Sequence, residues 1–212
     1  MLTIGLDRAG WPFILGAVVV ALTGYWLGGR LWALPGLLLA VGFLFFFRDP
    51  DRPLPADQAL IVSPADGAVK YVGPAMPGSP DGTWQQITIF LSPLDVHVNR
   101  APLSGRVTRV AYKPGKFLPA YWPESGAVNE QAEVWIDHHG QPAVYRQVVG
   151  VLARRVVARV VEGDQLRVGQ RVGVMKFGSR MDVFLPPELP VQVRVGDHVV
   201  GAVTVLSRWT TP

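Results

Sequence analysis

The amino-acid sequence predicts a mainly β protein, with many short antiparallel strands preceded by an N-terminal hydrophobic helical hairpin. Two uncharged apolar segments lie back to back before residue 48. From about residue 56, short runs of Val, Ile and Leu alternate with Gly and Pro, a pattern typical of antiparallel sandwiches and barrels. We therefore expect an anchoring hairpin over residues 1–50 and a β-rich domain over residues 51–212.

The two apolar segments account for the hairpin. Residues 12–29 and residues 31–47 contain no charged side chain, and only Arg30 separates them. Each segment would be about 26 Å long as a helix, close to the roughly 30 Å hydrocarbon thickness of a bilayer. We therefore expect a tight helical hairpin in a membrane. Pro35 lies inside the second segment, so a spanning and a re-entrant form both stay open.

The charges that flank the hairpin indicate its orientation. Arg8 precedes the hairpin and Arg48 and Arg52 follow it, so the positive-inside bias places both ends and the main domain on the cytoplasmic side of the inner membrane. A cleaved signal peptide fits less well, because the apolar sequence continues to Phe47 and no basic n-region with a small-residue cleavage site precedes it.

The second part of the chain is expected to form short strands joined by turns. The predicted strands are Ile61–Val62, Gly67–Val72, Gln86–Leu91, Gly105–Tyr112, Glu133–Ile136, Ala143–Arg154, Val156–Val161, Arg171–Phe177, Asp182–Phe184, Gln192–Val195 and Val199–Leu206. The one helical signal here is a turn or two near Pro119–Asn129. An active site in this domain must therefore lie on loops and strand ends.

The composition narrows the function classes. The chain of 212 residues has no cysteine, which excludes a disulfide framework, a cysteine metal site and a thiol nucleophile. Its net charge of +4 suits an anionic partner, either nucleic acid or acidic lipid headgroups. A nucleic-acid binder should also interleave aromatic and basic residues on one face, and the sequence shows no such pattern. We therefore expect no nucleic-acid partner.

Turn motifs recur within the β-rich part. Pro64–Val69 and Pro102–Val107 share a P-x-x-G-x-V form, and Glu162–Val172 and Val195–Val203 share a G-D turn. These elements resemble the half-motifs of biotinyl and lipoyl carrier domains, which are barrel-sandwich hybrids. The resemblance offers an alternative function, a membrane-anchored carrier or adaptor that is modified at Lys176 or not modified at all. The carrier pattern is incomplete, because a phenylalanine follows this lysine where carriers have a methionine.

Three polar residues in predicted loops suggest catalysis. Asp66, His97 and Ser179 provide a carboxylate, an imidazole and a hydroxyl, which are the components of a nucleophilic serine site. Ser179 follows Gly178 in a two-residue break between strands, and such a break ordinarily predicts a hairpin turn. An ordinary hydrolase is disfavoured, because the serine lacks both the G-x-S-x-G frame and a following helix.

Seven motifs then point to one family. They are FFFRDPDR (45–52), SPADGAV (63–69), FLSPLDVHVNRAPLSGRV (90–107), YKPGKF (112–117), VNE (128–130), VLARRVV (151–157) and EGDQLRVGQRVGVMKFGSRMDVFLP (162–186). In this order they resemble phosphatidylserine decarboxylase in its short, single-domain prokaryotic form. The likeness covers nearly the whole chain, and several long motifs in one order make coincidence improbable.

The resemblance implies that the chain cleaves itself between Gly178 and Ser179. The Ser179 hydroxyl would attack the Gly178 carbonyl, and elimination would leave a pyruvoyl group at position 179. Its ketone would form a Schiff base with phosphatidylserine in the membrane and release CO2 to give phosphatidylethanolamine. A large chain (1–178) and a small chain (179–212) would remain together as a heterodimer. The resemblance implies neither a metal nor pyridoxal phosphate, and a homo-oligomer stays open.

The resemblance also assigns roles to other residues. His97 and Asp66 would carry the acid and base steps, and either one can be the cleavage base. Arg100 stands where longer members have a second histidine, so it is either a contact for the substrate phosphate or carboxylate, or a satisfied surface arginine. The L-G-S-T cleavage motif of those members is F-G-S-R here. The remaining polar residues are expected to be structural: Asp95, Asn99 and Glu130 in loops, and His138, His139 and His198 as exposed turn residues.

Overall fold

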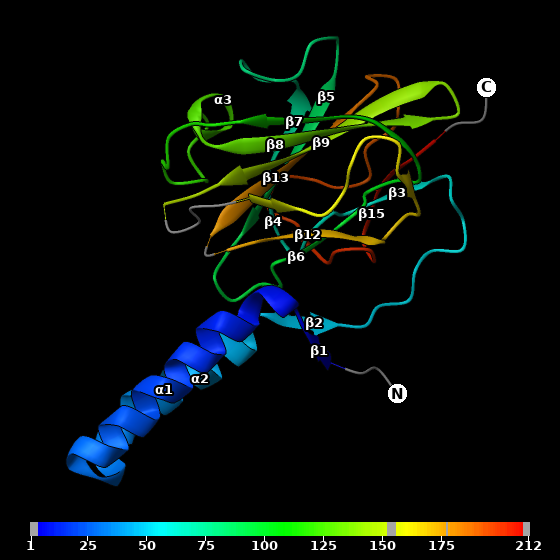
Figure 1. The fold of residues 1–212 in the computed structure, drawn as a ribbon. Coiled ribbons are helices and arrows are strands. Elements are labelled where there is room, and N and C mark those ends of the chain that lie inside the picture. The colour runs from blue at the N-terminus through cyan, green and yellow to red at the C-terminus, as the bar shows by residue number, and fades with distance from the viewer. Residues whose placement is uncertain (1–3, 152–155, 177, 210–212) are drawn as a thin grey trace. The chain divides into compact units, whose positions relative to one another are not determined.

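The structure is a computed structural model that describes residues 4–151, 156–176 and 178–209. The chain divides into a unit that ends at Asp51 and a unit that begins at Arg52. The first unit contains two long helices and the second is built mainly from strands (Figure 1). The predicted fold class, a mainly β protein preceded by a helical hairpin, is therefore confirmed.

The first unit is a helical hairpin whose ends are joined by two short strands. Its elements are β1 (Ile4–Leu6), η1 (Arg8–Gly10), α1 (Trp11–Gly28), α2 (Arg30–Phe46) and β2 (Arg48–Pro50), with β1 and β2 antiparallel. Gly29 alone makes the turn between the helices, with a left-handed φ of 79° that glycine adopts without strain. Pro35 lies inside α2 and does not start it.

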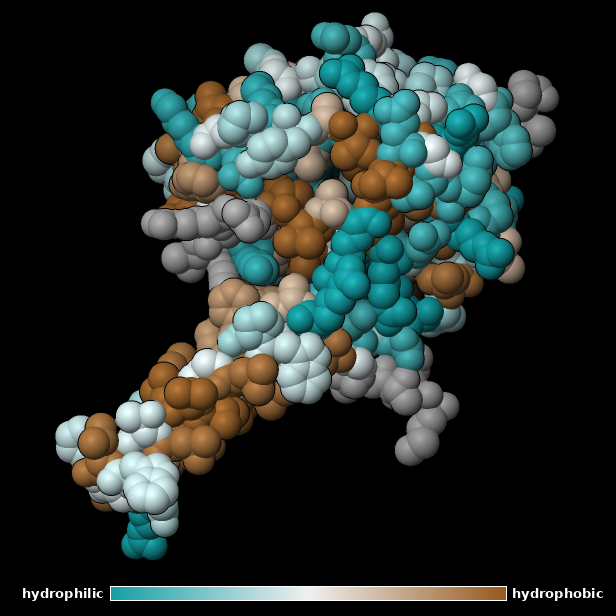
Figure 2. All heavy atoms as spheres, in the orientation of Figure 1, coloured by the Kyte–Doolittle hydropathy of each residue, from teal (hydrophilic) through white to brown (hydrophobic). Residues whose placement is uncertain are grey.

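Small residues let the two helices approach closely. A Cβ atom added to Gly24 would lie 2.1 Å from the carbonyl oxygen of Trp32, and one added to Gly36 would lie 2.3 Å from the backbone nitrogen of Ala21. Large apolar side chains cover the outside of the helices (Figure 2). The segment Arg8–Gly28 is long and apolar enough to cross a membrane, whereas α2 is shorter.

The second unit consists of antiparallel sheets. Its elements are β3 (Leu60–Val62), β4 (Gly67–Pro74), β5 (Gln85–Leu91), β6 (Val98–Arg100), β7 (Gly105–Lys113), α3 (Ser125–Val128), β8 (Gln131–His138), β9 (Gln141–Val149), β10 (Val156–Ala158), β11 (Gln165–Leu166), β12 (Arg171–Met175), β13 (Ser179–Leu185), β14 (His198–Val199) and β15 (Val205–Arg208). An eight-stranded sheet has the order β11-β7-β8-β9-β13-β5-β4-β14, and smaller sheets have the orders β10-β12-β6 and β15-β3.

Most predicted strands are present, and two predictions near the C-terminus are wrong. Gln192–Val195 is not a strand, because this segment runs irregularly between turns. The predicted strand Val199–Leu206 is divided into β14 and β15 by a turn in which Ala202 has a left-handed φ of 63°. The short strands β6 and β11 were not predicted. The predicted strand ends at Arg154 and Phe177 lie outside the described residues.

One buried apolar cluster joins the large sheet to the smaller ones. It includes Ile61 of β3, Ile89 of β5, Tyr145 of β9, Met175 of β12 and Met181 of β13. Burial strongly raises the pKa of the Tyr145 phenol, so this side chain is neutral in the core. Because β13 is buried on both faces, it forms the rigid centre on which the site is built.

Candidate active site

The Gly178–Ser179 junction connects two different sheets. The strand before it, β12, pairs with β6 and β10, whereas the strand after it, β13, pairs with β5 and β9. The junction is therefore a crossing between sheets and not the hairpin turn that a two-residue break ordinarily predicts. Both flanking strands are fixed by their own neighbours, so the junction is held at each end.

Gly178 has a backbone that suits glycine and few other residues. Its φ is 72°, in the left-handed region that costs a residue with a Cβ about 1 kcal/mol. Its carbonyl oxygen lies against Gly150, because a Cβ added to Gly150 would come within 2.3 Å of that oxygen. Gly150 therefore leaves room for the carbonyl that the sequence analysis expects to be attacked.

Ser179 begins β13 and is completely buried. It pairs with Leu91 on one side and with Val149 on the other. Its hydroxyl oxygen is buried and has no hydrogen-bond partner among the described residues. A buried hydroxyl without a partner lowers stability by about 1–3 kcal/mol, so this serine is a poor choice for structure alone. Its position is suited to a reaction with the adjacent peptide.

His97 contacts the junction directly. The backbone N–H of Gly178 donates to His97 Nε2 at 3.4 Å, and His97 Nδ1 lies 2.9 Å from the carbonyl oxygen of Asp95. Because an N–H can only donate, Nε2 acts as the acceptor and Nδ1 carries the hydrogen that Asp95 accepts. The imidazole is 1% exposed, so it is shielded from bulk water, and its basic nitrogen faces Gly178. The structure thus brings two of the three predicted catalytic residues, His97 and Ser179, to one place.

Asp66 is held by an ion pair. Its carboxylate accepts hydrogen bonds from Arg52 at 2.6 and 2.7 Å and from the backbone N–H of Gly201 at 2.8 Å. The loop that carries Asp66 also supports the site, because the carbonyl of Pro64 accepts from the backbone N–H of Arg100 in β6, the strand that follows His97. The loop that contains Asp66 is therefore connected to the segment that contains His97 by a backbone hydrogen bond, and Asp66 does not contact the Gly178–Ser179 junction through any hydrogen bond described for it.

Arg100 lies inside the protein. Its side chain is 2% exposed, and Nη1 donates to the carbonyl oxygen of Gly169 at 3.2 Å. The alternative of a surface arginine with local hydrogen bonds is therefore wrong about exposure, because Arg100 lies in β6, which pairs with β12 in the interior. This burial could not be predicted from local sequence, because β6 is only three residues long and two of them, Asn99 and Arg100, are polar.

A buried charge cluster lies on β13 directly after the serine. The Asp182 carboxylate accepts from Arg180 Nε at 2.7 Å, from Arg146 Nη2 at 2.7 Å and from the Thr88 hydroxyl at 2.7 Å. Burial alone would raise the pKa of Asp182, but the guanidinium groups of Arg180 and Arg146 outweigh it and hold the pKa below its ordinary value. This cluster was not predicted, although Arg180 and Asp182 alternate with Met181 and Val183, a pattern that places both charges on one face of a strand.

A small apolar cavity reaches the junction. It has a volume of about 210 Å³ and is lined by Phe90, Pro93, Pro119, Ala120, Tyr121, Val151 and Gly178. The lining comes from the end of β5, the loop between β7 and β8 and the residues after β9, so segments far apart in sequence meet there. Sequence spacing alone could not predict this cavity.

The other polar residues mostly have structural contacts. Asn99 accepts a hydrogen bond from Gln147 at 2.8 Å, and His198 is exposed as expected. His138 was predicted to be exposed, which is wrong: it is 8% exposed, because its ring stacks on Trp209 at 5.0 Å. Within the described ranges, no three His, Asp or Glu side chains are grouped so as to hold a metal ion.

The fold and the site define a mainly β protein in which a glycine–serine junction with a buried serine meets a buried histidine beside an apolar cavity. A family model described as phosphatidylserine decarboxylase matches residues 39–207 of this chain. Because the match spans most of the chain, the chain belongs to the phosphatidylserine decarboxylase family. The comparison favours the decarboxylase interpretation over the carrier or adaptor alternative.

Individual relatives agree with this assignment. Three proteins named phosphatidylserine decarboxylase proenzyme are similar along nearly their whole length. The protein of Nitrosomonas eutropha is 40% identical over 205 residues, covering 96% of this chain and 95% of the relative. That of Symbiobacterium thermophilum is 43% identical over 207 residues, with coverage of 96% and 95%. That of Solibacter usitatus is 41% identical over 199 residues, covering 94% of both.

Proposed function

We propose that this chain is the precursor of a pyruvoyl-dependent phosphatidylserine decarboxylase and that it cleaves itself between Gly178 and Ser179. The observation that carries the proposal is the buried, unpartnered Ser179 hydroxyl directly after a glycine whose backbone N–H meets His97 Nε2. The relatives are named as proenzymes, which supports a processing step.

The cleavage uses groups that the chain supplies. The Ser179 hydroxyl gives up its proton to a base and adds to the Gly178 carbonyl carbon. The tetrahedral intermediate then breaks the bond between this carbon and the Ser179 nitrogen. The nitrogen takes up a proton, and an ester remains between Gly178 and the Ser179 side chain. Loss of the Ser179 α-proton then breaks the Cβ–O bond, which releases Gly178 as a carboxylate and leaves dehydroalanine at position 179. Tautomerisation and hydrolysis of the resulting imine release ammonia and leave a pyruvoyl group.

We assign the first proton transfer to His97. Its basic nitrogen lies 3.4 Å from the backbone nitrogen of Gly178, the residue directly before the serine. Asp66 is the other proposed acid–base residue. Its carboxylate is engaged with Arg52 and Gly201, so direct transfer from Ser179 to Asp66 would require this pair to open. Arg100 is proposed only as a candidate headgroup contact, and its burial favours a structural role.

The pyruvoyl group would supply a carbonyl that binds the amine of phosphatidylserine and accepts the electrons released with CO2. The residues present fit such a group, because Gly150 leaves space beside the junction and both Ser179 and His97 are shielded from bulk water. Apolar walls along the cavity suit the part of a lipid that adjoins its headgroup. We expect no metal in this reaction.

The helical hairpin would hold the enzyme where its substrate lies. Its outer surface is apolar, and a diacyl lipid does not diffuse freely in water. We propose location at the inner membrane with the β unit in the cytoplasm, as the flanking arginines indicate. The mature enzyme would be a heterodimer of residues 1–178 and 179–212.

The proposal is tested by intact mass and a denaturing gel on purified protein. We expect two chains, with no free amino group on the smaller one, and release of labelled CO2 from phosphatidylserine. The Ser179→Ala variant should remain one chain and release none. Ser207→Ala, which alters another fully buried serine, should be cleaved normally. An uncut chain that decarboxylates phosphatidylserine would exclude the proposal.

The same assay separates the two candidate bases. If His97 is the base, His97→Gln should slow precursor cleavage by about 10²–10⁴-fold, the usual contribution of a positioned base. Asp66→Asn should then slow cleavage less, because Asp66 would act through its loop. The reverse order would assign the cleavage base to Asp66.

A further inference from the structure

The loop between β7 and β8, residues 114–130, carries exposed aromatic side chains next to the junction. Tyr121 is 60% exposed and Trp122 is 45% exposed. The Tyr121 ring contacts Phe90 edge-on, with centroids 5.9 Å apart, and lies 6.5 Å from the Trp122 ring. Because Phe90 and Tyr121 also line the cavity that reaches Gly178, the exposed rings continue the cavity wall outward.

Other apolar side chains extend this surface around the cavity. Val151, which lines the cavity, is 54% exposed, and Leu94, which follows the lining residue Pro93, is 71% exposed. We call Leu94, Tyr121, Trp122 and Val151 the apolar rim. Exposed apolar groups gathered around a cavity mark a surface that is covered in function, whereas single exposed apolar residues need no explanation.

The backbone beneath the rim is firmly held. Arg180 Nη1 donates to the carbonyl oxygen of Trp122 at 3.4 Å, and the Ser125 hydroxyl donates to the same oxygen at 2.7 Å. Asn129 Nδ2 donates to the carbonyls of Leu118 and Val149, at 2.8 Å in both cases. Buried polar groups thus fix the loop in a shape that keeps two aromatic rings in water. The loop is therefore preorganised to present them.

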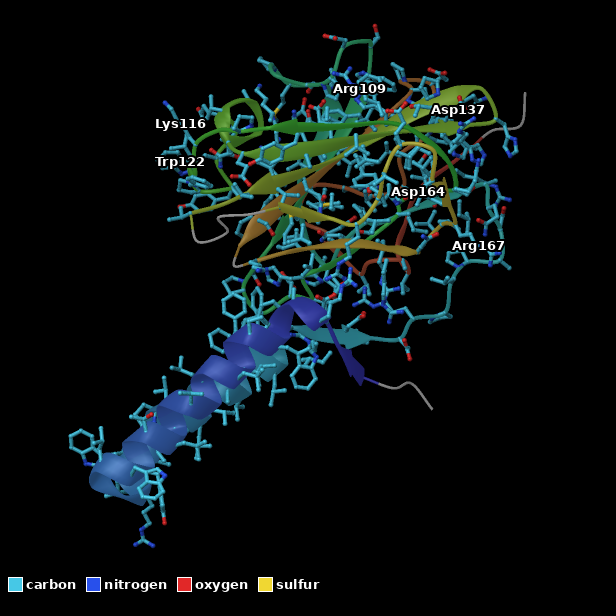
Figure 3. All side chains as sticks on the ribbon, in the orientation of Figure 1. Arg109, Lys116, Trp122, Asp137, Asp164 and Arg167 are labelled. Carbon is cyan, nitrogen blue, oxygen red and sulfur yellow. The ribbon has the colours of Figure 1, made fainter. Side chains whose placement is uncertain are left out.

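The chemistry of the rim matches a lipid surface. Trp and Tyr favour the membrane–water interface, because each ring has an apolar body and one polar group. Among the described residues, the exposed charges on this surface are Lys113 at the end of β7, Lys116 and Glu124, which is a surplus of one positive charge and is compatible with anionic lipid. Lys116 and Trp122 lie at the same end of the β unit, near α3 (Figure 3).

We propose that the apolar rim inserts into the interfacial layer of the bilayer, so that a lipid headgroup passes directly from the membrane into the cavity at Gly178. This inference rests on the proposed function for its substrate, and it adds a second membrane contact that is independent of the helical hairpin. Tyr121 and Trp122 are positioning residues in this scheme: they place the cavity mouth at the depth of the headgroups.

The absence of cysteine allows a direct test. In the full-length protein, reconstituted in vesicles of phosphatidylserine and phosphatidylcholine, Trp122→Cys is labelled with an environment-sensitive fluorophore. Val161→Cys is the matched control, because Val161 is 65% exposed and lies in the turn before β11. We expect the label at position 122 to shift to shorter wavelength and to be quenched by lipids with brominated acyl chains, while the label at position 161 stays accessible to aqueous iodide.

Each other result overturns the inference. Iodide quenching at both positions would show that the rim stays in water, and lipid quenching at both would show that no particular face is inserted. Protection of position 122 from both quenchers would indicate that protein, and not lipid, covers the rim. These readouts do not depend on decarboxylation, so an inactive protein with a lipid-quenched label would overturn the proposed function and leave this inference standing.

Activity gives a second readout. The Trp122→Ser variant changes a rim residue that does not line the cavity, so it should cleave itself normally and should turn over a short-chain phosphatidylserine below its micellar concentration at an unchanged rate. With vesicles, its KM for phosphatidylserine should rise about fivefold, the scale of losing partial burial of one aromatic ring. The Val161→Ser variant should behave as the unmodified protein. An unchanged KM on vesicles would contradict the proposal.

Discussion

Replacing Asp182 with asparagine should destabilise the β unit by about 3–5 kcal/mol, the usual cost of removing one partner from a buried ion pair. Asp182 is fully buried, and its carboxylate accepts from two guanidiniums that are themselves only 1% and 3% exposed. The substitution would leave Arg146 and Arg180 charged and buried. Glu133, at 3.6 Å from Arg146, compensates one of them in part, so we expect a value near the lower limit.

The measurement is thermal unfolding of the detergent-solubilised chain. Asp182→Asn is introduced into the Ser179→Ala chain, so that every molecule has the same uncut backbone. For a chain of this size, 3–5 kcal/mol corresponds to a fall in Tm of about 6–20 °C. The control is Asp57→Asn, which removes an exposed ion pair with Arg208 and should cost less than about 1 kcal/mol. A loss below about 1 kcal/mol for Asp182→Asn would refute the reasoning.

The stability difference between the Ser179→Ala parent and the same chain with Asp182→Asn should depend on pH in one direction. Because the folded-state pKa of Asp182 is lowered, the stabilisation is present above the unfolded-state pKa of about 4 and is lost as the pH falls through the lower folded-state value. The difference in free energy of unfolding between the parent and Asp182→Asn should therefore be constant at neutral pH and should shrink only below about pH 4. A difference that grows as the solution is acidified would contradict the assigned charge state.

Three further substitutions have expected outcomes. Tyr145→Phe should leave stability unchanged or raise it by about 1 kcal/mol in urea unfolding, because it removes a buried hydroxyl that has no partner among the described residues; a loss above about 1 kcal/mol would reveal a missed partner. Gly178→Ala should slow precursor cleavage on a timed gel, because a φ of 72° costs alanine about 1 kcal/mol. Gly150→Ala should slow precursor cleavage more, since its Cβ would lie 2.3 Å from the Gly178 oxygen. Equal cleavage rates for the unmodified chain and these two glycine variants would show that the Gly178 carbonyl is free to move.

The sequence predicted the hairpin because the signal for it is local. An uncharged apolar run specifies a helix by itself, and α1 and α2 begin one residue before the predicted segments and end one residue before their ends. The strand β6 was missed for the opposite reason. It contains Asn99 and Arg100, which are polar and yet buried, and their burial depends on β12, which lies some 70 residues later in the chain.

The candidate site was predicted in its members but not in its arrangement. His97 and Ser179 were singled out by residue type and by resemblance, and the structure joins them through the Gly178 backbone. The partner of Asp66 was not predicted, because Arg52 was interpreted only as a charge that orients the hairpin. Local patterns specify which residues form a strand, whereas they do not specify which distant strand lies beside it. The Gly178–Ser179 break therefore looked like a hairpin although it connects two sheets.

That connection explains how a chain could be cut there and remain folded. No ladder hydrogen bond joins β12 to β13 in the described part of the chain, so breaking the peptide removes a covalent link and leaves both sheets paired. The small chain would begin with β13, which pairs over Ser179–Leu185 with β5 and over Ser179–Phe184 with β9. Its later strands β14 and β15 pair with β4 and β3. The new N-terminus would thus belong to a central strand, which holds a reactive group in place more firmly than a free chain end.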